Sequence, residues 1–302
     1  MAHLFPASEP GSPARSEPSS SPSASSSYPS GRDEGGLPSS GDRLLAVLGL
    51  FTINRPAWTV EEAAEKLEVS ATTAYRYFKR LTRVGLISPV SGASYTLGPA
   101  IIQMDRQIQL CDPMLRAARG VMAGLIRQVP EGGVLSLCRL FHDRVMCVHQ
   151  VMGDNPPELI SYERGHPMPL FRGAGSKIIL AYLPNRTLKS LFERNTQAIA
   201  DADLGRDWDE FRRLLAAIRR AGVASTAGDL NPNRVGVAAP IFDQRRAILG
   251  SLNFVVPQQN FDDALRVRLT GLVTVGAREI QAGMLAAAEE SGASRPRVRV
   301  PR

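Results

Sequence analysis

The residues whose types and spacing point most directly to chemistry lie between Ser70 and Arg83. This stretch contains four basic residues and no acidic one: Arg76, Lys79, Arg80 and Arg83. The preceding stretch, Glu61–Glu68, contains four acids and one lysine. Basic side chains neutralise phosphate, and arginine can also make two hydrogen bonds to the edge of a guanine. A helix over Ser70–Arg83 would therefore present a positive surface suited to nucleic acid.

Short hydroxyl side chains at the start of this stretch add a second signal for DNA. Ser70, Thr72 and Thr73 can bond phosphate oxygens or base edges, and Arg76 follows one helical turn later. Tyr75, Tyr77 and Phe78 are expected to lie partly in the core, so that not all three contact DNA. The predicted DNA contacts are Ser70, Thr72, Thr73, Tyr75, Arg76, Lys79, Arg80, Ser91 and Tyr95. Two other interpretations stay open: a helix-turn-helix that binds protein, and a basic helix face that is only solvated.

The elements that would position these residues are three helices and a short hairpin. An apolar stripe predicts a first helix over Asp42–Phe51. Thr59 and Ser70 stand where the N-cap residues of the second and third helices belong, because a hydroxyl there accepts an otherwise unpaired backbone N–H. Two strand-like runs then flank a polar tip: Leu86–Ser88 and Ser94–Leu97. This order predicts a winged helix-turn-helix over residues 41–98, whose second motif helix enters the major groove.

Length and composition exclude several other classes of protein. The 302 residues suggest two folded units, and 43% hydrophobic residues are enough for buried cores. No stretch approaches the ~18–20 apolar residues of a membrane span, and the chain start lacks a signal-peptide pattern. Three cysteines are too few for a disulfide scaffold. We expect a soluble, cytoplasmic protein without membrane contact, whose net charge of +7 favours an anionic partner.

The two ends of the chain differ from the rest in composition. Residues 1–40 contain 13 Ser, 7 Pro and 4 Gly, so they cannot bury enough apolar surface to offset the entropy of ordering. Residues 291–302 carry four arginines around two prolines. Both segments are predicted to be disordered tails.

Residues 99–112 are predicted to form a linker helix, and residues 113–290 a mixed α/β domain. Helical stretches alternate there with four strand-like runs, Val134–Leu140, Val145–Val151, Val235–Ile241 and Ile248–Val256. A strand is also expected from Ala221 to Ala224. The fold class is thus α+β.

A hairpin in this domain would bring two cysteines together. With His142 and Asp143 as the turn pair, Cys138 lies directly opposite Cys147, where Cβ atoms of paired residues are ~4.5–5.5 Å apart. This arrangement allows a redox switch or, with His142 and His149 nearby, a metal site. We prefer a third interpretation, that both thiols simply pack in the core as small apolar groups.

The loop before residue 176 has a composition that suits a ligand site. Gly173, Ala174 and Gly175 precede an apolar helix, and small residues at a helix start let an anion approach the backbone N–H groups. Tight packing of the helix on a sheet explains the same residues equally well. No catalytic triad, nucleotide loop or metal-ligand spacing is present, so we predict no catalytic residue, no metal and no cofactor.

Taken together, the motifs resemble the isocitrate lyase regulator (IclR) family of bacterial transcription factors over about residues 43–285. Thr72-Thr73-Ala74-Tyr75-Arg76 is similar to the core of the family's recognition helix, and Tyr95-Thr96-Leu97-Gly98 to the motif that closes its wing. In the second domain the similar segments, in family order, are Pro169-Leu170, Gly173-Ala174-Gly175-Ser176-Lys177, Leu180-Ala181, the run from Ile218 to Ala224, and the run from Ala238 to Asp243.

This resemblance implies a linker helix used for dimerisation and a GAF-like domain that binds a small effector, often a carboxylic acid. It also implies homodimers or homotetramers on palindromic double-stranded operator DNA. By motif, the effector pocket would be lined by Ile160, Met168, Ala174, Gly175, Asp229, Gly236, Asn253 and Val255.

Three departures from the family pattern bear on the effector. Ser176 replaces a smaller residue, Val255 stands where a hydroxyl is usual, and the loop Thr226–Asp229 lacks an acidic pair. They suggest an organic or aromatic acid larger or more apolar than a two- or three-carbon acid. The expected function is a sequence-specific DNA-binding transcriptional regulator whose operator binding the effector modulates. The alternatives are a metabolic enzyme with an accessory helix-turn-helix head, and a cysteine-based redox or metal sensor.

Overall fold

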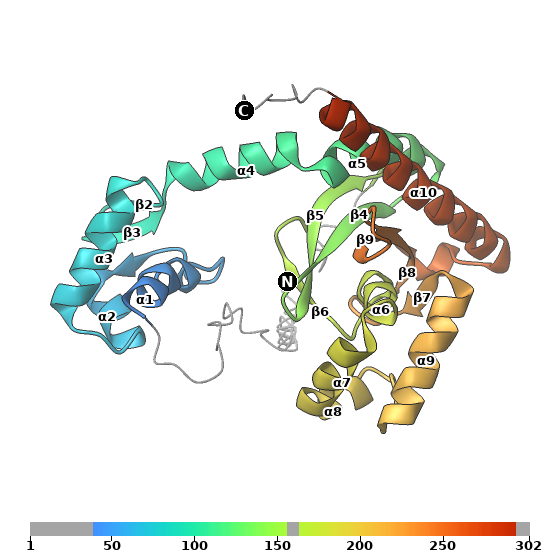
Figure 1. Ribbon diagram of the computed structural model, residues 1–302, viewed down its shortest axis with the longest axis horizontal. Helices are drawn as coiled ribbons and strands as arrows, with labels where there is room; N and C mark the ends of the chain where they lie inside the picture. Colours follow the sequence, from blue (N-terminus) through green and yellow to red (C-terminus); the bar gives the residue numbers. More distant parts are fainter. Residues whose placement is uncertain (1–38, 156–162, 294–302) are drawn as a thin grey trace, which may run out of the picture. The chain divides into compact units, whose positions relative to one another are not determined.

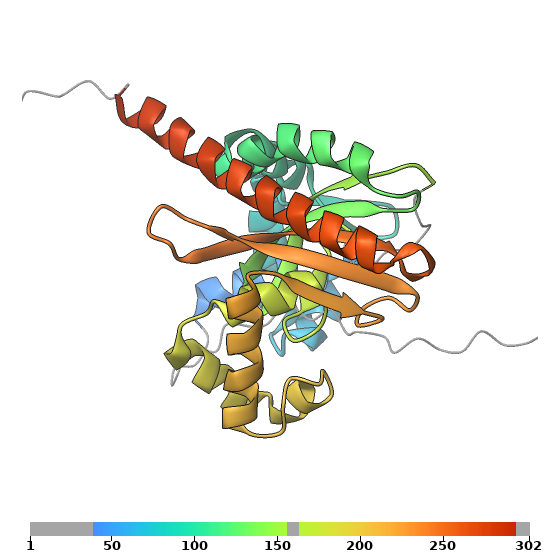
Figure 2. The ribbon, with the colours of Figure 1, turned by 90° about the vertical axis from the view of Figure 1, so that its right-hand side faces the viewer.

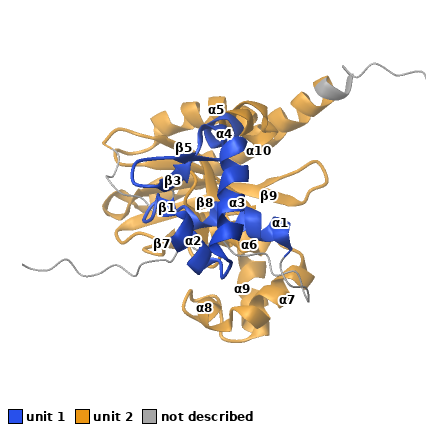
Figure 3. Ribbon diagram, turned by 90° about the vertical axis from the view of Figure 1, so that its left-hand side faces the viewer, with its two compact units in different colours: residues 1–105 blue, residues 106–302 orange. Residues whose placement is uncertain are grey.

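The computed structural model describes residues 39–155 and 163–293, with side chains to residue 290 (Figure 1). The chain divides into two compact units, residues 1–105 and 106–302 (Figure 3). The predicted disordered tails fall mostly on residues 1–38 and 294–302, which lie outside the described residues.

The first unit is a helical head with a small antiparallel sheet. Its elements are α1 (Ser40–Ala46), a 3₁₀ turn (Leu48–Leu50), β1 (Trp58–Thr59), α2 (Val60–Lys66), α3 (Ala71–Arg83), β2 (Ile87–Pro89) and β3 (Ser94–Leu97). The strands lie in the order β1-β3-β2, so β2 and β3 form the predicted wing. The strand β1, which pairs Trp58 with Tyr95, was not predicted.

Side-chain caps fix where the helices of the head begin. Thr59 and Glu62 form a reciprocal capping box at the start of α2, and the Ser70 hydroxyl accepts the N–H of Thr73 at the start of α3. Both predicted N-caps are therefore confirmed. A similar box at Ser39 starts α1 at Ser40, so the prediction of disorder through residue 40 was wrong at its last position.

The first predicted helix is also shorter than expected. α1 ends at Ala46 and the chain continues as a 3₁₀ turn rather than as α-helix to Phe51. Tightening of the last turn is common at helix ends, because it satisfies carbonyls that have no further α-helical partner. Phe51 is extended, and its buried side chain joins the core of the head.

A 13-residue helix, α4 (Pro99–Cys111), follows the wing and contains the boundary between the two units. Gly98 precedes it directly, and a Cβ added at Gly98 would collide with the backbone oxygen of Gly85. No residue of α4 is buried, and its largest exposed apolar side chains are Ile102, Met104, Ile108 and Leu110. Asp112 caps the next helix, and its carboxylate also pairs with Arg139 at 2.6 Å.

The second unit is built on a six-stranded antiparallel sheet in the order β6-β5-β4-β9-β8-β7. The strands are β4 (Val134–Phe141), β5 (Arg144–Met152), β6 (Pro167–Pro169), β7 (Ala224–Ala227), β8 (Arg234–Phe242) and β9 (Ile248–Pro257). All four strands predicted as runs of Val, Leu and Ile are confirmed within two residues at each end.

Helices cover both faces of this sheet (Figure 2). On one face lie α5 (Pro113–Leu125), a 3₁₀ turn (Ile126–Gln128) and the long α10 (Asp263–Ala293), around a core that includes Leu137, Val237 and Phe254. On the other face lie α6 (Ala174–Ala181), α7 (Asn185–Arg194), α8 (Thr196–Ala200) and α9 (Trp208–Ala221). A short 3₁₀ turn (Gln258–Asn260) joins β9 to α10.

Two details of the second unit differ from expectation. The predicted strand from Ala221 to Ala224 is wrong, because Ala221 ends α9 and Gly222 caps it in the left-handed conformation, so β7 begins only at Ala224. α10 continues to Ala293, past the predicted domain end at residue 290. Among the described helices, none combines the length and apolar character needed to cross a bilayer.

Candidate nucleic-acid interface and effector site

One face of α3 carries the predicted DNA contacts. Ala74, Tyr77, Phe78 and Leu81 are buried in the core of the head, which leaves the opposite face to solvent. That exposed face carries Thr72, Tyr75, Arg76, Lys79, Arg80 and Arg83. The expectation that Tyr75 lies partly in the core was wrong, because its side chain is 55% exposed. No ion pair within the described part of the chain engages any of the four basic residues of this face. The face therefore offers uncompensated positive charge along the whole helix.

The remaining predicted contacts have structural tasks as well. The Ser70 hydroxyl lies 2.9 Å from that of Thr73 and caps α3, so its position is fixed by the helix start. Ser91 is exposed in the wing. Tyr95 is half-buried, and its ring packs edge-on against Phe78 with centroids 5.0 Å apart. Of the nine predicted contacts, Tyr95 is thus the one whose side chain packs most against the core of the head.

The structure brings most of the predicted effector residues to one face of the sheet. Ala174 and Gly175 begin α6, which packs on the face that Gly236, Asn253 and Val255 present from β8 and β9. Met168 lies in β6, at the opposite edge of the sheet, with three strands between it and Gly236. Ile160 falls outside the described residues.

Two of the predicted glycines allow a close approach of helix and sheet. A Cβ added at Gly236 would lie 3.2 Å from the Cβ of Ala174, and one added at Gly175 would lie 3.4 Å from the Ser251 hydroxyl. These contacts support the tight-packing interpretation of the small residues. Space for a ligand must therefore lie beside this contact and not on it.

A carboxylate already occupies the start of α6, and it belongs to the protein. Asp229 Oδ2 accepts the backbone N–H of Gly173 at 3.0 Å and lies 2.7 Å from Lys177 Nζ. Lys177 also donates to the carbonyl of Ala202. Asp229 was predicted as an effector contact, whereas Lys177 was not singled out, because its partner is 52 positions away in the sequence.

Buried polar groups line the sheet next to α6. Asn253 donates through Nδ2 to the hydroxyl of Ser136, which itself donates to the carbonyl of Asn253, and Ser251 donates to the carbonyl of Gly175. The Oδ1 atom of Asn253 has no hydrogen-bond partner among the described residues, although the residue is only 6% exposed. Ser136 and Ser251 were not predicted, since isolated serines in apolar strands give no sequence signal.

The predicted register of the cysteine hairpin is confirmed. Cys138 pairs with Cys147 and Leu140 with Val145, with a left-handed residue, His142, in the turn. Both thiols are completely buried. The hydrogen bond with Cys138, together with burial, raises the pKa of the Cys147 thiol well above its usual range. Complete burial also keeps reagents away from both thiols, which favours packing over redox chemistry.

Thiol titration of the folded protein tests this conclusion. We expect one fast equivalent per chain with a disulfide reagent, from the exposed Cys111, and reaction of Cys138 and Cys147 only on unfolding. Rapid reaction of all three thiols in the folded state would restore the redox interpretation.

Comparison with known proteins identifies both units. The IclR helix-turn-helix domain matches residues 40–91, and the C-terminal domain of bacterial IclR transcriptional regulators matches residues 112–282. The HTH-type transcriptional regulator KipR of Bacillus subtilis is 21% identical over 236 residues, which cover 78% of this chain and 93% of KipR.

Solved structures show the same fold. An IclR-type regulator from Silicibacter superposes with a TM-score of 0.69 at 20% identity, covering 82% of this chain and 96% of its own. An IclR homolog from Microbacterium hydrocarbonoxydans, solved in complex with 4-hydroxybenzoate, gives a TM-score of 0.67 at 19% identity, covering 82% of this chain and 100% of its own.

The matching families and relatives are transcriptional regulators, which sets the enzyme alternative aside. The match to the C-terminal domain alone spans more than half of the 302 residues. The chain therefore belongs to the IclR family of bacterial transcriptional regulators, with a helix-turn-helix DNA-binding domain in its N-terminal unit.

Proposed function

We propose that the protein binds operator DNA with α3 in the major groove and the wing on the neighbouring backbone. The observation that carries this proposal is the exposed, acid-free face of α3. Arg76 is assigned to a base edge, because it lies one turn after the helix start, where recognition helices contact bases. Lys79 and Arg80 lie farther along the same face and are assigned to phosphates.

The DNA-binding form is proposed to be a homodimer, or a tetramer of two such dimers, formed through α4. Four large apolar side chains are exposed on this helix, between 50% and 74% of their surface: Ile102, Met104, Ile108 and Leu110. Met104 and Ile108 are four residues apart and share one face of the helix, so a second α4 packed on this face would remove their apolar surface from water. Two heads related by a twofold axis would then read a palindromic site.

A small organic or aromatic acid is the proposed effector, bound beside the contact of α6 with the sheet. Asn253 Oδ1, buried and without a partner, favours a ligand that also carries a hydroxyl or another hydrogen-bond donor. The 4-hydroxybenzoate bound by the Microbacterium homolog has this combination of groups. An effector changes operator affinity only through different affinities for two arrangements of the protein.

Footprinting of the full-length protein on genomic fragments tests the DNA-binding assignment. We expect a protected palindrome whose half-sites lie about one helical turn, or a multiple of it, apart. Repeating the titration with hydroxylated aromatic acids should shift the protection midpoint for at least one of them, and Asn253→Leu should abolish that shift without changing affinity in the acid's absence. Protection without any sequence preference would contradict operator recognition by α3.

A further inference from the structure

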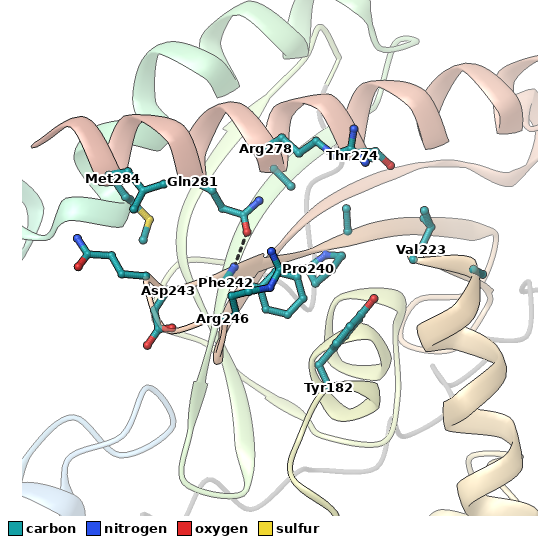
Figure 4. A pocket seen from close by; sticks show the side chains of 16 residues that line it. Tyr182, Val223, Pro240, Phe242, Asp243, Arg246, Thr274, Arg278, Gln281 and Met284 are labelled. Carbon is teal, nitrogen blue, oxygen red and sulfur yellow. Dashed lines mark hydrogen bonds between the residues drawn. The ribbon is translucent and has the colours of Figure 1, made fainter. Parts of the chain in front are cut away.

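A cavity in the C-terminal unit shares no lining residue with the proposed effector site. Its volume is ≈ 770 Å³, within the range of small-molecule pockets, about 300–1,000 Å³. It is enclosed by α10, by the hairpin that joins β8 to β9, and by Tyr182 with the end of α9 (Figure 4).

This cavity lies where the sheet loses a strand. β7 pairs with β8 only as far as Ala238, so residues 239–242 of β8 have no strand on that side. Pro240 has no N–H to offer, and the N–H of Phe242 donates to Oε1 of Gln281 at 2.9 Å (Figure 4). A peptide strand added beside Pro240 and Phe242 would thus find no free backbone N–H to bond with. The gap beside β8 therefore suits a small molecule better than a strand of another protein.

The walls of the cavity are apolar and partly aromatic. Tyr182 and Phe242 meet edge to face, with ring centroids 4.9 Å apart. Buried or half-buried aliphatic side chains complete the walls: Val223, Ala239, Pro240, Ala277 and Met284. A flat apolar body, such as an aromatic ring, gains most from contact with such a surface.

The rim of the cavity is positively charged. Arg278 projects from α10 and Arg246 from the hairpin (Figure 4), and neither forms an ion pair within the described ranges. The one acid on the rim, Asp243, already accepts the backbone N–H groups of Arg245 and Ala247. Arg219 adds further positive charge nearby, 5.8 Å from the centre of the Tyr182 ring.

We propose that this cavity is a second ligand site, which binds an organic anion with a flat apolar body. The ring of the ligand lies against Tyr182 and Phe242, and its anionic group lies between Arg246 and Arg278. β8 carries both Gly236, at the proposed effector site, and Phe242, at the cavity, so the two ligands contact one strand.

Photolabelling of the full-length protein with 4-benzoylbenzoate tests this proposal. The probe combines a flat aromatic ketone with a carboxylate, and on irradiation it inserts into nearby C–H bonds, readily into those of methionine. We expect peptide mapping to place the label on Met284 or on another residue of the cavity wall. The uncharged parent benzophenone should label these residues less.

Charge reversal separates this site from the effector site. The double variant Arg246→Glu with Arg278→Glu should lower labelling in the cavity by about fivefold or more, because the two new carboxylates repel the anionic probe. Both arginines are exposed, so neither substitution creates a buried charge. Arg268→Glu, an exposed arginine elsewhere on α10, is the matched control and should leave labelling unchanged. Asn253→Leu should also leave it unchanged. Label outside the cavity, labelling insensitive to the two reversals, or loss of label in Asn253→Leu would overturn the proposal.

Discussion

Replacing Arg76 with alanine is expected to weaken operator binding by about 1–3 kcal/mol, or about 5- to 150-fold in Kd. The guanidinium is exposed on α3, has no ion-pair partner within the described chain, and lies where a bidentate bond to guanine is within reach. The loss should be concentrated at one base pair of each half-site. Fluorescence anisotropy with operator duplexes at a fixed salt concentration measures it.

Two further variants separate base reading from simple charge attraction. Lys79→Ala should weaken specific and non-specific DNA binding alike and reduce the salt dependence of binding by about one ion per head. Lys66→Ala removes an exposed charge from α2, outside the proposed interface, and should change little. An Arg76→Ala protein that binds its operator as tightly as the wild type would show that α3 is not the recognition helix.

The head could be predicted from sequence because its signals are local. The caps of α2 and α3 depend on residues three positions apart, Thr59 with Glu62 and Ser70 with Thr73, and the charge of α3 is visible in consecutive letters. β1 was not predicted, because a strand of two residues is too short to show an alternation of apolar and polar side chains. Its pairing with β3 is decided by the tertiary contact of Trp58 with Tyr95, 37 positions later.

In the C-terminal unit, features set by neighbouring residues could be predicted, and contacts between distant segments could not. The hairpin register of Cys138 with Cys147 follows from a short turn, and was predicted for that reason. The neighbour of β4 on its other side is β9, more than 100 residues later, and nothing in the sequence specifies it. The cavity beside β8 exists because β7 pairs with β8 only as far as Ala238 and because α10 passes nearby. No sequence motif indicates either feature.

The same limit applies to the proposed effector site. The small residues before Ser176 indicate an anion at the start of a helix, and the structure has one there, the carboxylate of Asp229. From the sequence we predicted a ligand anion at this position, or tight packing of the helix on the sheet, and we did not foresee that a side chain of the protein fills the position. The seat formed by Gly173 N–H and Lys177 is therefore able to hold a carboxylate, whether the protein's own or a ligand's.

Replacing Asp229 with alanine is expected to destabilise the C-terminal unit by about 2 kcal/mol, because Lys177 is left charged and largely enclosed. The side chains of Lys177 and Asp229 are only 11% and 25% exposed, so solvent replaces the lost partner incompletely. For a domain of this size the melting temperature should fall by about 4–8 °C. Asp263→Ala is the matched control, because it breaks an ion pair of similar length, 2.9 Å, whose carboxylate is 93% exposed. It should cost under about 1 kcal/mol.

Acetate should partly restore the Asp229→Ala protein. Acetate can enter the space left by the Asp229 side chain and bond to Gly173 N–H and Lys177. At an acetate concentration of one to four times its Kd, binding would restore about 0.4–1 kcal/mol of stability. Chloride at the same ionic strength controls for screening, and the wild type, whose seat is filled, should not respond. If acetate raises the melting temperature of both proteins equally, the start of α6 does not select carboxylates, and an acidic effector must bind through other residues. If only the variant responds, Gly173 N–H and Lys177 bind a free carboxylate, and Asp229 prevents this binding in the wild type.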